Sequence, residues 1–321
     1  MNQKISVLMP LYNAALYVES AIQSVVNQTY TDWELIIVDD GSTDDSLAVV
    51  KRYESDKIRV YTQPNSGACM ARNKALSLVK GAYVKFLDAD DLLAPDCLEK
   101  QFAQIQTLAA NQIPFGDYNY INQAGQITST YLFEWQLPLV EDSVYFFFTH
   151  WEVLITAPLH RIESLLAING FDEQLKRGQE TDLHFRLALS GVEFVYCPLH
   201  TFSYRSYVSI DRLSAQKEQL LEQYSSYIYE KNERLLREKF VTLAPKYQLV
   251  FRTHYFVQAR KCFARRQLTE GKINLSKALC YKPRSLFMWF YYVVGQIIGY
   301  VRLESAFQYR LSKLKTKKLN S

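Results

Sequence analysis

Short apolar runs alternate with amphipathic stretches over the first ninety residues of the chain. Runs of four or five apolar or β-branched residues indicate strands, and the longer stretches between them have the spacing of helices. The predicted strands are Ile5–Met9, Leu35–Val38, Ile58–Tyr61 and Tyr83–Leu87, and the predicted helices are Ala15–Gln28, Asp44–Glu54 and Ala68–Val79. Strands and helices in alternation predict an α/β fold with a parallel or mostly parallel sheet.

Local signals refine this pattern in two places. Ser42 and Thr43 precede two aspartates, which predicts an N-cap and an acidic first turn for the second helix. Residues 96–110 have a helical pattern, whereas residues 111–160 are rich in aromatic residues and are interrupted by three prolines. We therefore expect 111–160 to be irregular and partly extended.

A second patterned block begins at residue 170. Apolar residues along 170–191 predict a helix that ends at Gly191, and a short strand, Glu193–Cys197, follows it. From about residue 213 the pattern becomes helical and charged. The chain is thus predicted to hold a helical appendage after its α/β part.

Charge separates these two parts of the chain. Residues 1–250 contain 22 Lys and Arg against 31 Asp and Glu, whereas residues 251–321 contain 15 against 2, a net charge of about +13. Residues 285–301 carry no charge, are rich in aromatic residues and precede a basic tail. This favours an interfacial helix on a membrane over a spanning one, with a packing appendage or dimer face as the alternative. No nucleic-acid-binding module accompanies the basic residues, so nucleic acid is not expected as a partner.

Two acidic clusters carry the candidate chemistry. Asp39-Asp40 and Asp88-Ala89-Asp90-Asp91 each close a predicted strand, so they should lie side by side at one edge of the sheet. Adjacent carboxylates suit a hard divalent cation such as Mg²⁺ or Mn²⁺, whose remaining ligands are water or substrate phosphates. The alternative is that each aspartate caps the next helix or turn.

Glycine-rich nucleotide-binding loops are missing from the sequence. Neither G-x-G-x-x-G after the first strand nor G-x-x-x-x-G-K-[ST] occurs, which argues against dinucleotide-dependent dehydrogenases and P-loop enzymes. Four other blocks stand in order: PLYN at 10–13, WELIIVDDGSTDDS at 33–46, SGACMARNKAL at 66–76 and FLDADD at 86–91. These blocks resemble the family 2 inverting glycosyltransferases of GT-A fold, over about residues 4–205.

The resemblance implies a fold and a division of the chain. The fold is a GT-A type, Rossmann-like mixed sheet flanked by helices, with a C-terminal helical appendage. Residues 1–212 would form the glycosyltransferase domain, in which about 1–110 bind the nucleotide-sugar and about 111–212 bind the acceptor. Residues 213–321 lie beyond the resemblance, and their own charge and hydropathy predict a helical, basic region that contacts a membrane through 285–318.

Site residues follow from the same resemblance. Nucleotide-sugar contacts are implied for Pro10, Tyr12, Asn13, Asp39, Asp40, Gly67, Arg72, Asn73, Asp88, Ala89, Asp90 and Arg205. Asp90 would bind the metal directly, with Asp88 facing the ribose or a metal-bound water and His200 near the diphosphate as a further ligand. For Arg72 the alternative is a structural salt bridge to one of the carboxylates, and Arg205 could neutralise the leaving phosphate.

Displacement at an anomeric carbon requires a base for the acceptor hydroxyl. Relatives usually carry Glu-Asp before a leucine-rich helix, but Gln179 and Glu180 stand there in this chain. Glu180 therefore takes the position of the base, and Asp182 is the competitor. His184 lies one turn after Glu180 and is expected to make only a helix hydrogen bond. Aromatic residues of 131–151, among them Trp135 and Trp151, are expected in the core, with stacking on an acceptor sugar as the alternative.

Together these features predict a metal-dependent inverting glycosyltransferase that uses Mn²⁺ or Mg²⁺ and a nucleoside-diphosphate sugar, of which a UDP-sugar fits best. A glycan or lipid-linked acceptor in cell-surface polysaccharide or glycolipid synthesis is implied. The start of the chain has no secretory signal pattern and its five cysteines form no disulfide framework, which predicts a cytoplasmic protein at the inner face of the plasma membrane. The alternatives are a catalytically silent nucleotide-sugar-binding protein and a nucleotidyltransferase.

Overall fold

The computed structural model describes residues 3–133, 142–149, 153–206, 218–281 and 286–305. The chain divides into two compact units, Met1–Asn232 and Glu233–Ser321. The division falls inside helix α9 (Glu218–Lys239), so the first part of α9 belongs to the N-terminal unit. The boundary expected near residue 212 lies outside the described residues.

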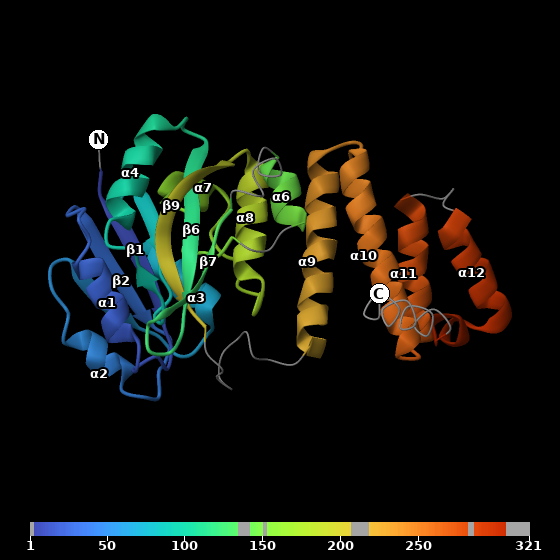
Figure 1. Cartoon of the computed structure of the whole chain (residues 1–321), viewed down its shortest axis with the longest axis horizontal. Coiled ribbons are helices and arrows are strands. Elements are labelled where there is room, and N and C mark those ends of the chain that lie inside the picture. The colour runs from blue at the N-terminus through green and yellow to red at the C-terminus, as the bar shows by residue number, and fades with distance from the viewer. Residues whose placement is uncertain (1–2, 134–141, 150–152, 207–217, 282–285, 306–321) are drawn as a thin grey trace, which may run out of the picture. The chain divides into compact units, whose positions relative to one another are not determined.

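The N-terminal unit is built on a five-stranded sheet in the order β3-β2-β1-β4-β8 (Figure 1). Strands β1 to β4 are mutually parallel where they pair, and the short β8 runs antiparallel to β4. The bounds are β1 Ile5–Leu11, β2 Trp33–Asp39, β3 Ile58–Thr62, β4 Tyr83–Phe86 and β8 His160–Arg161. The four strands predicted from the sequence are confirmed, and they form the parallel sheet that their alternation with helices indicated.

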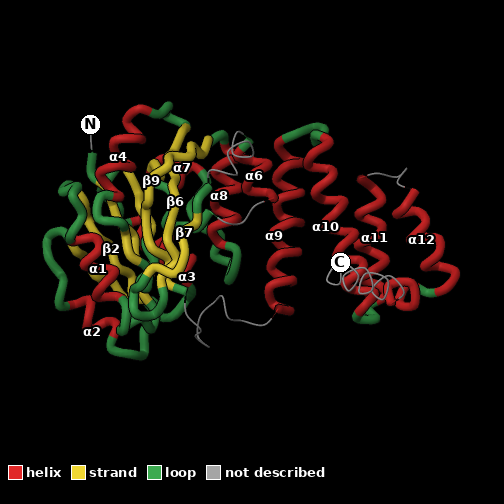
Figure 2. The backbone as a smooth tube through the Cα atoms, in the orientation of Figure 1, coloured by secondary structure: helices red, strands yellow, loops and turns green. Residues whose placement is uncertain are grey.

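Helices cover this sheet, as Figure 2 shows for the red segments around the yellow strands. The crossovers are α1 Val18–Val26, α2 Ser46–Lys51 and α3 Ala68–Ser77, and α4 Cys97–Thr107 follows. Every residue of β2 is buried, as expected for a parallel strand with helices on both faces. The predicted cap of α2 is wrong in detail. The helix begins at Ser46, whose N–H donates to the Asp44 carboxylate, and neither Ser42 nor Thr43 caps it.

A second sheet occupies the region expected to be irregular. Its order is β5-β9-β6-β7, with β5 at Leu92–Leu93, β6 at Gln112–Ile121, β7 at Ile127–Tyr131 and β9 at Glu193–Arg205. Aromatic cross-strand pairs hold it together: Tyr118 stacks on Tyr131 and on Phe202 with ring centroids 5.0 Å apart. Pro114 misled the prediction because it lies within β6, which pairs with β9.

Three further helices precede α9 in the described part of the N-terminal unit. They are α6 Ser143–Thr149, α7 Ile162–Ala167 and α8 Gln179–Ser190. Helix α8 is bounded by two glycines in the left-handed region, Gly178 and Gly191, which confirms the predicted end at Gly191. All five cysteines are free thiols. Three of them are buried, Cys262 is partly buried and Cys280 is exposed.

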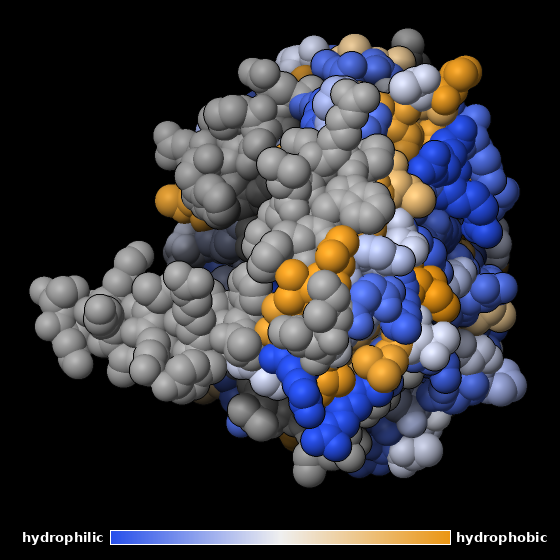
Figure 3. Space-filling model, turned by 90° about the vertical axis from the view of Figure 1, so that its right-hand side faces the viewer, coloured by the Kyte–Doolittle hydropathy of each residue, from blue (hydrophilic) through white to orange (hydrophobic). Residues whose placement is uncertain are grey.

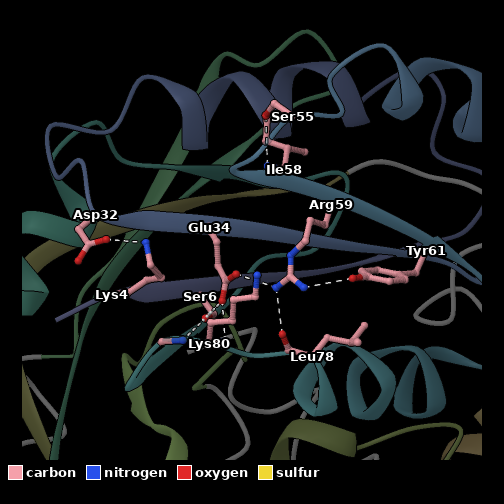
Figure 4. Close-up of polar contacts among 11 residues, drawn as sticks. Lys4, Ser6, Asp32, Glu34, Ser55, Ile58, Arg59, Tyr61, Leu78 and Lys80 are labelled. Carbon is pink, nitrogen blue, oxygen red and sulfur yellow. Dashed lines mark hydrogen bonds and ion pairs between the residues drawn. The ribbon is translucent and has the colours of Figure 1, made fainter. Parts of the chain in front are cut away.

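A buried polar network joins the amino ends of three strands (Figure 4). The Glu34 carboxylate accepts hydrogen bonds from Ser6 Oγ at 2.6 Å, Lys80 N–H at 2.7 Å and Arg59 Nη2 at 2.7 Å. Arg59 also donates to the Leu78 carbonyl, which follows α3. Burial alone would raise the pKa of Glu34, but these donors outweigh it and the pKa is lowered. The network ties α3 to the strands at the end of the sheet remote from the acidic clusters.

The C-terminal unit is helical, as predicted. It contains the end of α9, α10 Pro245–Ala264, α11 Leu268–Tyr281 and α12 Leu286–Ile298. Its core is an apolar cluster of Ala259, Phe263, Leu275, Tyr291, Tyr300 and Leu303. Buried Glu304 accepts two hydrogen bonds from Arg260, at 2.7 and 2.8 Å, and one from Tyr291. Among the helices that the structure describes, none combines the length and apolarity needed to cross a bilayer.

Candidate active site

Hydrogen bonds of the PLYN turn connect the carboxyl ends of β1 and β2. Asn13 adopts a left-handed conformation with φ of 47°, which asparagine tolerates better than most residues. Its side-chain oxygen accepts from Thr43 N–H at 2.8 Å, and its own N–H donates to Ser42 Oγ at 3.1 Å. Pro10 pairs with Val38 across the two strands. Asn13 therefore shapes the turn, whereas the half-exposed Tyr12 presents its ring to solvent.

Asp40 organises the loop before α3. Its buried carboxylate accepts from Gln63 Nε2 at 2.7 Å and from the backbone N–H groups of Ser66 and Gly67, both at 2.8 Å. Gly67 has a φ of 95°, a conformation that side chains rarely allow. Asp39, also buried, accepts more weakly from Ser42 N–H. The DDGS aspartates thus hold the loops of residues 41–42 and 63–67 at the edge of the sheet where β1 and β2 end.

The Asp-Ala-Asp turn follows β4 at the same edge of the sheet. Asp88 is half-buried and forms a 2.6 Å ion pair with Arg72 of α3. Ala89 and Asp91 are buried, and Asp91 Oδ1 accepts from Arg205 N–H at 2.8 Å. The salt bridge that was the alternative for Arg72 is therefore present. The acidic clusters predicted to converge do so, with Asp88 and Asp90 partly open to solvent.

Arg205 supports this turn from beneath. Its Nε donates to the Asp90 carbonyl at 2.9 Å, and its Nη1 donates to the carbonyls of Asn122 and Gln123. The guanidinium also lies 4.9 Å from the centre of the Tyr17 ring, and the residue is 4% exposed. The predicted contact with a leaving phosphate is not what this geometry favours. Arg205 donates its hydrogen bonds to backbone carbonyls and so positions the Asp-Ala-Asp turn.

Arg72 connects the Asp-Ala-Asp turn to α8. Besides the Asp88 pair, its Nη1 donates to Gln179 Oε1 at 2.6 Å, and its guanidinium lies 5.4 Å from the Phe171 ring centre. Burial opposes the charged form, but Asp88 outweighs it and the pKa of Arg72 is raised. One cation thus bridges the turn after β4 and the first residue of the helix that carries both candidate bases.

Glu180 and Asp182 lie in very different surroundings. Asp182 is fully buried and is paired with two cations, Arg186 at 2.7 Å and Lys231 at 2.6 Å. Glu180 is only partly buried, and within the described part of the chain no cationic side chain forms an ion pair with it. A fully buried carboxylate held between two cations cannot approach a substrate. Of the two candidates, only Glu180 is open to an acceptor.

Burial raises the pKa of Glu180. Arg72 lowers it in part, and the negative charge of Asp88 raises it again. The rise moves the carboxyl toward the range in which it both holds and releases a proton near neutral pH, which is what general base catalysis needs. The influence of Arg72 and Asp88 also shows that Glu180 lies within electrostatic reach of the acidic turn.

Of two supporting predictions, the one for Asn73 resolves into structural contacts, whereas no hydrogen bond joins the His184 ring to its own helix among the described residues. Asn73 accepts from Phe171 N–H at 2.8 Å and donates to the Phe171 carbonyl and to Glu173, so it fixes the 170–173 segment to α3. His184 is fully buried, with its ring 5.7 Å from that of His160. Burial lowers the pKa of His184 to about 3. Trp135 and Trp151 lie outside the described residues.

His200 is the clearest correction at the site. It is an exposed residue of β9 opposite Asp117 of β6, with Nε2 3.2 Å from Asn119 Nδ2. It lies five residues before Arg205, the residue that contacts Asp90, which is roughly 16 Å along a strand. The third metal ligand expected at His200 is therefore wrong, because among the described residues His200 forms no metal-binding group with Asp88 and Asp90.

The donor atoms at the turn nevertheless suit a hard cation. In the described part of the chain no group of three or more His, Cys, Asp or Glu side chains could hold a metal ion by itself. Asp88 and Asp90 are two carboxylates separated by one residue, and Mg²⁺ or Mn²⁺ is commonly bound by one or two carboxylates together with substrate phosphates and water. The residues present thus fit a metal whose coordination a diphosphate would complete.

Several contacts of this site could not be read from motifs. Gln63, the bridging amide of Gln179 and the cation of Lys231 all reach the site residues from other elements. Gln179 was noticed only as a departure from the usual Glu-Asp. A neutral amide that accepts from an arginine explains how that departure is accommodated.

Comparison with known proteins shows similarity to one family over the first part of the chain. Residues 6–150 match the family model described as Glycosyl transferase family 2. An Escherichia coli protein, UDP-Glc:alpha-D-GlcNAc-diphosphoundecaprenol beta-1,3-glucosyltransferase WfgD, is 38% identical over 121 residues, which is 37% of this chain and 47% of WfgD. The matched stretches of the first curated relatives span between 11% and 47% of their length.

Solved structures extend the likeness of fold to most of the chain. Staphylococcus aureus TarS (residues 1–349), in complex with UDP, matches with a TM-score of 0.63 and 18% identity over 95% of this chain and 91% of that chain. The mannosyltransferase PcManGT of Pyrobaculum calidifontis, in complex with GDP-Man and Mn²⁺, matches with a TM-score of 0.56 and 17% identity, over 94% and 82%. These matches confirm the predicted fold class.

Proposed function

We propose that the chain, whose residues 6–150 match the family model described as Glycosyl transferase family 2, transfers a sugar from a nucleoside-diphosphate donor to an acceptor hydroxyl. The observation that carries this proposal is the combination of a partly exposed acidic turn with a separate carboxylate that forms no ion pair with any described residue. Asp88 and Asp90 would face a bound diphosphate, and Glu180 stands on the first turn of α8 within electrostatic reach of Asp88. Binding alone would require the turn but not the carboxylate.

Glu180 is the proposed base. A partly buried carboxylate with a raised pKa can take the proton of an acceptor hydroxyl as that oxygen attacks the anomeric carbon. Attack on the face opposite the departing diphosphate inverts the anomeric configuration. Asp182 is assigned no proton transfer because two cations hold it inside the protein.

Asp90 and Asp88 are the proposed ligands of Mn²⁺ or Mg²⁺. Such an ion would supply charge neutralisation for the departing diphosphate. Arg72 holds the Asp88 carboxylate in place, and Arg205 fixes the backbone of the turn through the Asp90 carbonyl. The exposed ring of Tyr12 is available to stack on the nucleobase. Asp40 shapes the adjoining loop by accepting hydrogen bonds from its backbone N–H groups.

A UDP-sugar is the proposed donor, since TarS is in complex with UDP and the name of WfgD gives UDP-Glc as its donor. The mannosyltransferase in complex with GDP-Man shows why GDP-sugars must be tested as well. A glycan or lipid-linked acceptor in polysaccharide or glycolipid synthesis fits the relatives' names. The donor sugar itself is a matter for a screen of released nucleoside diphosphate.

Contact with the inner face of the plasma membrane is a further part of the proposal. Residues 251–321 carry the net charge of about +13, and α12 forms in the apolar segment. Figure 3 views the molecule from the side of α12, and the described part of that face shows small apolar groups between hydrophilic ones. We expect the full chain to sediment with anionic vesicles at low salt and to be released at high salt. Equal sedimentation with zwitterionic vesicles would contradict a charge-driven contact.

The decisive experiment compares turnover with binding. In Glu180→Gln we expect transfer to fall by about 10² to 10⁴-fold, while the dissociation constant for UDP stays within about twofold because Asp88 and Asp90 are untouched. Glu163→Gln, an exposed carboxylate on α7, is the matched control. In Asp90→Asn both turnover and Mn²⁺-dependent UDP binding should weaken, and a chelator should abolish transfer by the unchanged protein.

Two results would contradict the assignment. Unchanged transfer in Glu180→Gln would refute the assignment of Glu180 as the base. Unchanged transfer in Asp90→Asn would refute the assignment of Asp90 as a metal ligand. UDP binding without turnover on any donor would instead favour the silent binding protein.

A further inference from the structure

Helix α9 reaches back onto the segment that carries the proposed base. Lys231 is inserted between two carboxylates, with Nζ 2.5 Å from Asp172 Oδ2 and 2.6 Å from Asp182 Oδ1, and its side chain is only 10% exposed. Asp172 precedes α8 and Asp182 lies in its first turn. One cation thus fastens both the approach to α8 and the helix itself, and it belongs to the N-terminal unit.

An apolar contact reinforces this ion pair. Ile228 is 2% exposed and covers Gly178, where a Cβ atom would lie 2.5 Å from Ile228 Cδ1. Gly178 is the residue before α8, in the left-handed region with φ of 64°, two residues before Glu180. Tyr227, the residue before Ile228, donates a hydrogen bond from its hydroxyl to Gln174 Oε1 at 3.3 Å. We name Tyr227, Ile228 and Lys231 the α9 latch.

The latch holds the side of α8 that faces away from Glu180. Residues two apart on a helix point in directions that differ by about 200° around its axis. Asp182, pulled toward Lys231 and Arg186, therefore leaves Glu180 directed to the other side, where Arg72 and Asp88 lie. Arg186 is itself anchored to the Ile168 carbonyl. The direction of Glu180 thus depends on what holds Asp182.

We propose that Lys231 and Ile228 are positioning residues that set the placement of Glu180 relative to the acidic turn. The proposal rests on the proposed function of Glu180 as base. The latch touches neither Asp88 nor Asp90, so it acts on the transfer step and not on the binding of the nucleotide. It also gives the first part of α9 a role in the site, although the residues of that helix lie far along the chain from every motif.

Three variants of the full chain test the latch. Lys231→Met removes the charge and keeps the stem, Lys231→Arg keeps the charge, and Ile228→Ala removes the apolar contact without touching a charge. Lys4→Met is the control, because Lys4 forms an ion pair of 2.6 Å with Asp32 on an exposed surface of the same unit. For each variant the kcat of transfer, the KM of the donor and the dissociation constant for UDP are measured well below the melting temperature.

We expect Lys231→Met and Ile228→Ala to lower kcat by about 10- to 100-fold, the loss that a misplacement near 1 Å causes. The KM of the donor and the affinity for UDP should stay within about twofold, and Lys231→Arg should retain most of kcat. A folded Lys231→Met or Ile228→Ala with the kcat of the unchanged protein would overturn the proposal. So would a fall in UDP affinity as large as the fall in kcat. If Lys231→Met does not fold, Ile228→Ala decides by the same criteria.

Hydrogen exchange separates the latch from the proposed function. Amides of residues 179–184 should exchange faster in Lys231→Met and Ile228→Ala, while those of β2 stay protected. If the unchanged protein turns over no donor, the proposed function fails, and the exchange result still decides whether the latch holds α8. Normal protection of 179–184 in both variants would refute the latch whatever the activity.

Discussion

His184 should make the stability of the N-terminal unit sensitive to mild acid. The side chain is fully buried, with the rings of Phe147, Phe194 and His160 between 5.2 and 5.7 Å from it. Burial lowers its pKa from the usual 6.5 to about 3. The folded protein therefore keeps the imidazole neutral at a pH where the unfolded chain binds a proton.

The sign and size of the effect follow from proton linkage. Because the folded pKa is depressed, the stability is present above pH 6.5 and is lost as the pH falls from 6.5 toward 3. At 1.36 kcal/mol per pH unit, the loss between pH 7 and pH 5 is about 2 kcal/mol, and the full loss near pH 3 is about 5 kcal/mol. His160, whose pKa is also lowered well below 6.5 by burial, acts in the same direction.

Urea unfolding at pH 7 and pH 5, followed by tryptophan fluorescence, measures this effect. His184→Phe replaces the imidazole with an aromatic ring that binds no proton. The free energy of unfolding of this variant should therefore fall between pH 7 and pH 5 by about 2 kcal/mol less than that of the unchanged protein. Carboxylates titrate alike in both proteins and cancel in the difference. His200→Gln, an exposed site on β9, is the control and should keep most of the pH dependence. An equal pH dependence in His184→Phe and the unchanged protein would refute the reasoning.

Other features of the N-terminal unit lead to shorter predictions. Glu34→Gln should lower the free energy of unfolding by about 2 to 3 kcal/mol, because it leaves a half-buried arginine without its charge partner, whereas Lys4→Met at an exposed pair should cost under about 1 kcal/mol by the same denaturation assay. The value of kcat/KM should fall with decreasing pH as Glu180, whose pKa is raised above 4.5, becomes protonated. In Arg72→Met this fall should occur at higher pH, because loss of the neighbouring positive charge raises the pKa of Glu180 further. A shift to lower pH would contradict the assignment. Tyr12→Ala should weaken UDP binding by about 5- to 100-fold, the range of ring stacking on a base, without changing the melting temperature, and equal affinity would exclude a stacking contact.

The fold could be predicted where a single strand or helix carries its own signal. The strands β1 to β4 are short apolar runs between helices, and the acidic residues at their ends meet because parallel strands share an edge. The second sheet could not be predicted in the same way. The predicted strand Glu193–Cys197 is the first part of β9, but β6 and β9 are far apart in sequence, contain prolines and pair with an irregular register, so no local pattern shows that they pair.

The candidate site shows the same limit. The sequence placed Glu180 and Asp182 two residues apart on one helix but could not tell which is open, since Lys231 comes from a helix 49 residues further along. Arg205 and His200 lie on the same strand, and only the length of that strand shows that one supports the acidic turn and the other does not reach it. The residue types in the motifs indicated which chemistry is possible. Contacts between residues far apart in the sequence determine which of these residues can take part in it.

The three hydrogen bonds that Asp40 accepts from residues 63–67 have a thermodynamic consequence for ligand binding. Fixing the backbone of one loop residue costs about 1 to 2 kcal/mol of conformational entropy. Because Gln63, Ser66 and Gly67 are fixed by a carboxylate within the folded protein, that entropy is lost during folding and not when a nucleotide arrives. Replacing Asp40 with alanine should therefore weaken nucleotide affinity mainly through a less favourable binding entropy, which calorimetry separates from a lost contact.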